Sequence, residues 1–267
     1  MRHQSLFGIA AGFLLFSLAF GLLERLWPAL PASGRPRPGF ATDLSYWFFT
    51  PLVTKFVTRI AMIGGILAIA AASGVRLDKE SVTAFVQTRR TWSSALPLGA
   101  QAVLALFVGD FFAYWQHRLF HGRRLWRFHA VHHGSTRLDW LSSVRLHPVN
   151  EVLGRLAEVL PLILLGFRPG VLAAYVPFLT VYAIFVHANV PWDLGPLRWV
   201  ITTPRFHRWH HTSQDEGLDK NFAGLFPFWD LLFGTFYMPA GRQPERFGIR
   251  GEPVPEGLAA QLAYPFT

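Results

Sequence analysis

Histidines that recur at helical spacing are the residues of this chain best suited to chemistry. Eight of the 11 histidines fall in three short segments, HRLFH at 117–121, HAVHH at 129–133 and HRWHH at 207–211. On a helix, side chains three and four residues apart share a face, so each segment can direct its imidazoles at one point. Imidazole suits Zn, Cu, Fe and Ni ions, and eight imidazoles exceed the needs of one ion. The spacing predicts a dimetal site built from His117, His121, His129, His132, His133, His207, His210 and His211.

The alternative interpretation is a set of separate polar side chains. Isolated buried histidines would each need a hydrogen-bond partner, whereas shared metal ions satisfy all of them together. The sequence has no H-E-x-x-H motif of the kind that zinc hydrolases use. Oxygen activation by two irons is the other plausible chemistry for such a pair of ions, and it suits an apolar substrate that enters from a membrane.

Composition points to a membrane protein. Hydrophobic residues make up 51% of the chain and charged residues only 15%, which is low for a soluble protein. The absence of cysteine excludes disulfides, thiolate-ligated haem, iron–sulfur clusters and cysteine-based zinc sites. The net charge of +9 does not indicate nucleic acid, because apolar segments dominate and no nucleic-acid-binding motif is present. It fits a protein that faces anionic lipid head groups.

Apolar segments predict the membrane helices. Leu6–Leu23, Ile60–Val75 and Ala95–Trp115 approach or reach the length of a membrane span. Val152–Phe167 and Val171–Val186 predict a helical hairpin that dips into or crosses the membrane and returns. The predicted fold class is all-α, an integral membrane helical bundle with a membrane-surface helical cap that carries the histidine-rich dimetal site. We divide the chain into N-terminal transmembrane helices and loops at 1–94, a catalytic region with the hairpin at 95–240, and a C-terminal tail at 241–267.

Charge placement predicts the orientation in the membrane. Between His117 and His147 there are six arginines and a single aspartate. By the positive-inside rule this stretch lies on the cytoplasmic side. The first apolar helix is too long for a signal-peptide core and precedes no clear cleavage site, so we expect it to stay uncleaved. No organelle-retention tail is visible, and we expect a multi-pass protein of a bacterial inner membrane.

The motifs resemble a known family. The three histidine segments match the H-x3-H, H-x2-H-H and H-x2-H-H boxes of the fatty acid hydroxylase/sterol desaturase superfamily, whose members are integral membrane histidine-box di-iron oxidases. The resemblance covers roughly residues 100–238. Further matching elements are Asp110 with Tyr114-Trp115, His147-Pro148 with Glu151, His187-Ala188-Asn189, Asn221-Phe222-Ala223-Gly224, Phe228-Trp229-Asp230 and Phe233-Gly234-Thr235.

The resemblance implies two Fe ions, with O2 as co-substrate and two electrons, acting to hydroxylate or desaturate a lipid (fatty acyl, sterol or isoprenoid). It adds His187 to the eight ligands, and His147 as a candidate tenth ligand or as a structural residue beside Pro148. No catalytic side chain is expected beyond the metal centre. Asp110 lies two helical turns before His117 and can accept a hydrogen bond from a ligand imidazole, or pair with a local arginine. The other candidates for orienting the ligands are Glu151, Asn189, Asp215 and Asn221.

Electrons should come from a separate protein, such as a ferredoxin, a b-type cytochrome or a reductase. The chain has no G-x-G-x-x-G fingerprint and no fused haem domain. Two other function classes stay open at this point: a zinc- or copper-dependent membrane enzyme, and a non-catalytic metal transporter or lipid-binding membrane protein. Zinc found in purified protein would not decide between them, because zinc can replace iron in an imidazole site.

Overall fold

The protein is built from helices and connecting loops. The computed structural model describes residues 5–31, 37–89 and 91–267, and these contain no β-strand, only an isolated bridge between Thr212 and Phe247. The predicted all-α class is confirmed.

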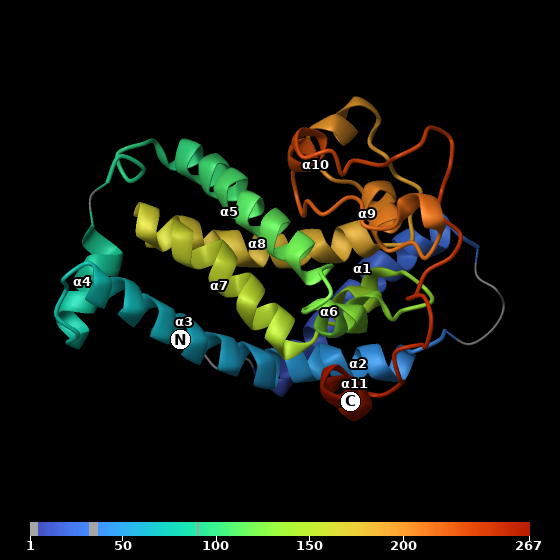
Figure 1. The fold of residues 1–267 in the computed structure, drawn as a ribbon, viewed down its shortest axis with the longest axis horizontal. Helices are drawn as coiled ribbons and strands as arrows, with labels where there is room; N and C mark the ends of the chain where they lie inside the picture. Colours follow the sequence, from blue (N-terminus) through green and yellow to red (C-terminus); the bar gives the residue numbers. More distant parts are fainter. Residues whose placement is uncertain (1–4, 32–36, 90) are drawn as a thin grey trace.

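Within the described residues, four helical segments are long and apolar enough to cross a membrane. They are α1 (Leu6–Leu26), the continuous segment Phe40–Ala72, α5 (Leu98–Phe120) and α8 (Pro169–His187). The multi-pass organisation expected from the sequence is therefore present. Figure 1 shows these helices with their ends gathered at one side of the molecule, where the cap lies.

The second of these segments contains a local widening. α2 (Phe40–Phe49) passes into a π-helix, η1 (Thr50–Thr54), and then into α3 (Lys55–Ala72). Pro51 stands in the first turn of η1, where its missing N–H removes an ordinary helical hydrogen bond. Such π-turns occur frequently at functional sites. This one lies beside the interior cavity described below.

The predicted hairpin is formed by α7 (Pro148–Leu165) and α8. Each helix begins with proline, whose fixed φ suits the first helical position. α7 ends at Gly166, which has a φ of 80° and supplies the left-handed cap that glycine adopts readily. α7 packs against α3 and α5 around a core that includes Leu162 and Phe167. The hairpin returns the chain to the side from which it started (Figure 1).

The cap consists of short helices and ordered loops. α6 (Trp126–His133), α9 (Pro204–His210), α10 (Phe228–Leu232) and α11 (Leu258–Ala263) lie at the end of the molecule opposite α4 (Lys79–Thr88) (Figure 1). Thr203 accepts a hydrogen bond from Phe206 N at 3.1 Å and so begins α9. The remaining turns are short 3₁₀ helices, η2 (Trp140–Val144), η3 (Gly195–Trp199), η4 (Asp215–Gly217) and η5 (Tyr264–Phe266).

A buried ion network joins the N-terminal helices to the cap. Asp43 in α2 pairs with Arg145 at 2.6 Å and with Arg37 at 2.6 Å. Arg37 in turn pairs with Asp139 at 2.5 Å. Glu24 in α1 accepts hydrogen bonds from two cap backbone N–H groups. The N-terminal helices are thus fixed against the histidine-bearing region, while the division of the chain at residues 94 and 240 stays a prediction.

Candidate metal centre

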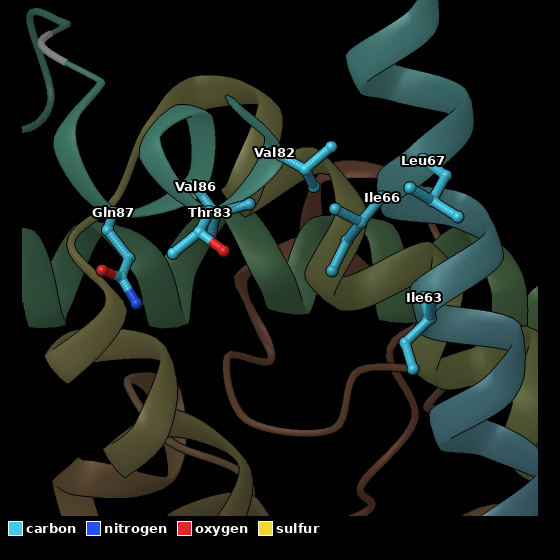
Figure 2. Close-up of a pocket in the computed structure, with 7 residues that line it drawn as sticks. All are labelled: Ile63, Ile66, Leu67, Val82, Thr83, Val86 and Gln87. Atoms are coloured by element: carbon cyan, nitrogen blue, oxygen red, sulfur yellow. The ribbon is translucent and has the colours of Figure 1, made fainter. Parts of the chain in front are cut away.

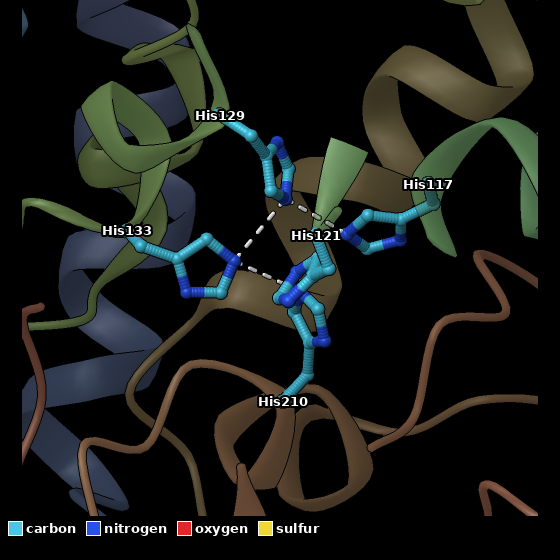
Figure 3. A group of neighbouring side chains, drawn as sticks. All are labelled: His117, His121, His129, His133 and His210. Atoms are coloured by element: carbon cyan, nitrogen blue, oxygen red, sulfur yellow. Dashed lines mark hydrogen bonds between the residues drawn. The ribbon is translucent and has the colours of Figure 1, made fainter. Parts of the chain in front are cut away.

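Five of the predicted histidines form a first group. Figure 3 shows them converging from three elements, with their ring nitrogens directed at a common centre. One coordinating nitrogen from each ring lies within 4.8 Å of every other. The first group comprises His117 and His121 from the end of α5, His129 and His133 from α6, and His210 from α9.

Four further histidines form a second group. Their coordinating nitrogens also lie within 4.8 Å of one another, and all four side chains are buried. The second group comprises His132 from α6, His187 from the end of α8, and His207 and His211 from α9 and its C-cap. Together the two groups contain all eight box histidines and His187.

The two H-x-x-H-H segments divide between the groups, which corrects the expectation that each segment serves one point. In α6, His129 and His133 are four residues apart and face the first group, whereas His132 faces the second. Adjacent helical residues point about 100° apart, because a turn takes about 3.6 residues. α9 divides in the same way, with His210 in the first group and its neighbour His211 in the second. One helix therefore supplies ligands to both groups.

Hydrogen bonds at Nδ1 fix the protonation of rings in the second group. His132 Nδ1 lies 2.9 Å from the carbonyl oxygen of Arg145, and His187 Nδ1 lies 2.7 Å from that of Ala183. A carbonyl oxygen only accepts, so in both neutral rings Nδ1 carries the hydrogen and Nε2 keeps its lone pair. These two Nε2 atoms lie 3.2 Å apart. Two lone pairs at this separation repel each other, and a cation between them turns the contact into a favourable one.

The first group shows the same conflict. His117 Nδ1 lies 2.7 Å from the carbonyl oxygen of Phe222, and His129 Nδ1 lies 2.7 Å from Asn150 Oδ1. The two Nε2 atoms, joined by a dashed line in Figure 3, lie 3.0 Å apart with no hydrogen to share.

His121 completes the argument. Its Nδ1 lies 2.9 Å from Asp219 Oδ1, while its Nε2 is buried without a hydrogen-bond partner among the described residues. Buried polar atoms without partners are rare and call for an explanation such as an ion. Asp219 also gains from the contact, because the hydrogen bond from His121 lowers the pKa of its carboxyl.

The nitrogen separations fit metal ions held by imidazole. Neighbouring Nε2 atoms within the groups lie 3.0 to 3.2 Å apart. An ion about 2.1 Å from each nitrogen places adjacent ligands roughly 3.0 Å apart and opposite ligands roughly 4.2 Å apart in an octahedral arrangement. Five and four nitrogens leave positions open for other ligands, as a catalytic ion requires. The donor set therefore fits a pair of ions.

Burial keeps the cap imidazoles neutral. Loss of solvent is the main cause that lowers the pKa of each of these six rings well below its usual value, and mutual repulsion between neighbouring rings adds to it. A neutral imidazole offers the lone pair that a metal ion needs. The six rings are those of His129, His132, His133, His207, His210 and His211.

His147 is kept apart from both groups. Its Nδ1 accepts a hydrogen bond from Val149 N at 3.2 Å, so the ring serves as the N-cap of α7. Its Nε2 lies 3.2 Å from the carbonyl oxygen of Leu262 in the C-terminal tail. With both ring nitrogens engaged in this way, the structural role considered beside Pro148 replaces the tenth-ligand prediction.

Asp110 holds a loop rather than a ligand imidazole. Its carboxylate accepts hydrogen bonds from the backbone N–H groups of Gly224, Leu225 and Phe226, at 3.1, 2.8 and 2.8 Å. The expected contact with His117 is absent, because three amides occupy the carboxylate. The loop it holds follows Phe222, whose carbonyl oxygen contacts His117. Asp110 therefore acts on the ligand through the backbone.

The remaining candidates for orienting the ligands contact other groups. Glu151 pairs with Arg155 at 3.4 Å. Asp215 is exposed and pairs with Arg250. Asn189 bridges the chain at Leu30 to Arg208. Asn221 donates to the carbonyl oxygens of Phe206 and Tyr237, and accepts from Tyr237 N. Glu151 thus pairs within α7, while the other three hold loops, and no hydrogen bond to a ligand ring is present for any of the four among the described residues.

The groups that do orient the rings are mostly backbone carbonyls. Those of Arg145, Ala183, Lys220 and Phe222 each face a ligand Nδ1. Asn150 is a side chain that sequence reasoning missed, although it lies two residues after Pro148 in the H-P-x-x-E element. Carbonyl contacts leave no mark in the sequence, because every residue type carries the same oxygen.

An interior cavity of about 620 Å³ opens beside the two groups. His117 and His129 of the first group and His132, His187 and His207 of the second line part of its wall. A smaller hollow between α3 and α4, shown in Figure 2, is lined by apolar side chains with Thr83 and Gln87. It contains no group that could bind a metal or transfer a proton, so the chemistry of the protein centres on the larger cavity.

Comparison with known proteins identifies the family. The family model described as fatty acid hydroxylase matches residues 102–235, which include every residue of the two groups. The chain belongs to the fatty acid hydroxylase family. The resemblance read from the histidine boxes is confirmed, and this family membership, together with the four apolar helices, makes the chain an integral membrane protein.

Three relatives show how far the likeness extends within the fatty acid hydroxylase family. The ornithine lipid hydroxylase OlsE of Rhizobium tropici is 35% identical over 91% of this chain and 83% of its own length. The alkylglycerol monooxygenase of Danio rerio is 37% identical over 50% of this chain and 30% of that protein. The methylsterol monooxygenase 1 of Rattus norvegicus is 28% identical over 48% of this chain and 43% of that protein. No solved structure gives a significant match.

The different positions of His187 and His147 lead to a direct prediction. We expect His187→Ala to lower the metal content of the purified protein, because it removes a nitrogen from the second group. We expect His147→Ala to keep the full metal content, and to lower the stability by about 1 kcal/mol through loss of a helix cap. Elemental analysis and thermal unfolding of both variants test this. Full metal in His187→Ala, or metal loss in a folded His147→Ala, would contradict the assignment.

Proposed function

We propose that the chain is an integral membrane oxygenase in which nine histidines hold two iron ions beside a lipid-binding cavity. The observation that carries the proposal is the pair of imidazole groups, five and four rings, each of which contributes rings to the wall of one interior cavity. The ligands of the proposed irons are His117, His121, His129, His133 and His210 for one, and His132, His187, His207 and His211 for the other.

The metal pair, when bound and reduced, would supply the dioxygen chemistry: a lipid C–H bond, O2, two electrons and two protons give an alcohol and water. The protein's own residues prepare the site for this. Carbonyl oxygens hold the rings in one tautomer, and burial excludes water from the second group. The cavity brings the substrate alongside the rings, and no side chain is needed as a nucleophile.

Hydroxylation is favoured over desaturation by the names of the relatives. The three named above are a hydroxylase and two monooxygenases. A lipid substrate fits both these names and the position of the cavity among apolar helices. Zinc or copper chemistry, the alternative left open by the sequence, has no comparable support among these relatives.

The electrons are proposed to come from a separate acidic protein such as a ferredoxin, a b-type cytochrome or a reductase. Arg123 and Arg124 are exposed in the turn that links α5 to α6, directly after His121. A positive surface of this kind attracts an acidic carrier and speeds its encounter. A carrier bound there would lie close to the first group, because Arg123 and Arg124 are two and three residues from His121 in the sequence.

Product analysis with labelled oxygen tests the proposed reaction. Protein loaded with iron, supplied with reductant, oxygen-18 gas and extracted bacterial lipids, should transfer one labelled oxygen atom to a lipid, as followed by mass spectrometry. The His210→Ala variant should give no product. Loss of two hydrogens without label would instead mean desaturation. Zinc in place of iron, with turnover unaffected by removing oxygen, would refute the proposal.

We further propose that the protein lies in a bacterial inner membrane with the cap on the cytoplasmic side. The arginine-rich stretch from α5 to η2 supports this orientation. Because the chain has no native cysteine, a single introduced cysteine reports its own position. Arg124→Cys should resist a membrane-impermeant maleimide in intact spheroplasts and react after the membrane is broken. Equal labelling in intact spheroplasts would place the cap on the outer side.

A further inference from the structure

The interior cavity is amphipathic rather than uniformly apolar. Part of its wall consists of apolar side chains from α1, α2 and α8, among them Phe16, Trp47 and Leu179. Another part of the wall consists of charged side chains. They are Lys55 in α3 and three residues of α7, Glu151, Arg155 and Glu158, which we call the ladder. An acyl chain alone would need no such groups.

The ladder lies on a single face of α7. Its members are separated by four and three residues, and Arg155 pairs with Glu151 at 3.4 Å and with Glu158 at 3.0 Å. Each of the three side chains is largely shielded, with an exposed fraction of 17 to 18%. Two carboxylates around one guanidinium leave a net negative charge in the ladder, which suits a cationic group such as an ammonium.

Some of the other polar groups in the cavity wall are hydrogen-bond donors without partners in the described part of the chain. The ion pairs of Glu151 and Glu158 in the described residues are made with Arg155 and not with Lys55. Gln116 Nε2, Thr50 Oγ1 and Tyr46 Oη are buried, belong to lining residues, and lack hydrogen-bond partners in the described part of the chain. Unsatisfied buried donors are costly unless a ligand supplies the acceptor. An anionic oxygen group, a carboxylate or a phosphate, is rich in the acceptors that such donors lack.

Ionisable groups within membrane-spanning segments usually mark a substrate site. Lys55 lies within the spanning segment Phe40–Ala72, at the end of the π-turn that widens this helix. The positive charges of Lys55 and Arg155 balance the negative charges of Glu151 and Glu158, while the carboxylate of Asp110 is already held by three backbone N–H groups. The cavity wall is thus complementary to a group that carries both signs of charge.

The charged wall begins at the metal-binding rings. Gln116 directly precedes His117, and Glu151 directly follows Asn150, whose Oδ1 lies 2.7 Å from His129 Nδ1. At a rise of about 1.5 Å per residue, Arg155 and Glu158 lie about 7.5 and about 12 Å farther along α7 than Asn150. This distance is short compared with an extended acyl chain. A head group bound here lies next to the rings, while the acyl tails extend away among the apolar helices.

Resting on the oxygenase function proposed above, we propose that Lys55, Gln116 and the ladder form a binding site for a zwitterionic lipid head group. Lys55 and Gln116 receive its anionic oxygens, and the ladder receives its ammonium group. The C–H bond that is hydroxylated then belongs to the head group or to the carbons next to it, and not to the far part of an acyl chain.

Four lipids with identical acyl chains test the head-group site: an acylated amino acid with free carboxylate and ammonium, a phosphatidylethanolamine, a phosphatidylglycerol and a diacylglycerol. We expect the two zwitterionic lipids, the acylated amino acid and phosphatidylethanolamine, to be retained and hydroxylated preferentially. Comparison of these two lipids separates recognition of a carboxylate from recognition of a phosphate. Fragmentation should place the labelled oxygen in or beside the head group. Equal use of diacylglycerol, or oxygen in the distal half of a chain, would overturn the proposal.

Lys55→Met is the decisive variant, and Arg59→Met is its matched control, because Arg59 lies one turn later in α3, is exposed, and does not line the cavity. Loss of a charge-assisted hydrogen bond should raise KM for the zwitterionic lipid by at least about tenfold, with kcat changed by less than about twofold. Lys55→Arg should recover most of the loss, and Arg59→Met should behave as the wild type. Identical behaviour of the two methionine variants would refute the role of Lys55.

Binding keeps this test separate from the oxygenase proposal. Lipid retention, measured by native mass spectrometry, requires no turnover and no metal. Selective retention of zwitterionic lipid that Lys55→Met abolishes supports the head-group site even if no lipid is oxidised, in which case only the proposed reaction fails. If all four lipids are oxidised and are retained equally, the result supports the oxygenase proposal and refutes the head-group site.

Discussion

Lone pairs that face one another in a buried space are the constraint on which this structure depends. Hydrogen bonds to carbonyl oxygens fix Nδ1–H in His117, His132, His187 and His210, so the Nε2 lone pairs must point inward. Without a cation this arrangement is repulsive, and with one it is a ready-made binding site. Because the orienting groups belong to the backbone, the loops that carry them must be held with comparable accuracy.

Much of the polar chemistry outside the rings serves this purpose. Asp110 binds the amides of residues 224–226, and Asp230 binds those of Phe222 and Ala223 at 2.8 Å each. Arg145 carries the carbonyl oxygen that faces His132, and its guanidinium is fixed by Asp43 from α2. The N-terminal helices therefore support the metal centre as well as crossing the membrane. The same helices supply Lys55 and the apolar side of the cavity.

The sequence predicted the parts of this protein that depend on spacing. Histidine spacing indicated the metal centre, apolar length indicated the helices, and two successive apolar stretches, Val152–Phe167 and Val171–Val186, indicated the hairpin. It did not predict which group each ring joins, because His132 and His133 differ only in direction around a helix. It left His147 open between a ligand and a structural residue, and it did not predict the role of Asp110. A histidine is a usual metal ligand and an aspartate a usual partner of one, so residue type alone does not reveal their roles. Only the contacts in the folded protein show that His147 caps α7 and that Asp110 holds the loop at residues 224–226.

The C-terminal tail shows the same limit. Residues 241–267 carry no recognisable motif, yet Leu262 contacts the ring of His147 and Val254 packs beside Gly134 at the end of α6. Contacts between segments more than 100 residues apart depend on the complete fold and leave no local pattern. The charged ladder of α7 was visible in the sequence as Glu151, Arg155 and Glu158, but its meaning depends on the cavity that it lines.

Mössbauer spectroscopy of anaerobically reduced protein, loaded with the Mössbauer-active iron isotope, tests the central claim most directly. Rings in groups of five and four should give about two irons per chain in two different nitrogen-rich environments, seen as two ferrous signals of equal area. A single signal from no more than about one iron per chain, in protein whose metal content is saturated, would contradict the account. It would show that the inward-facing imidazoles do not form a pair of iron sites.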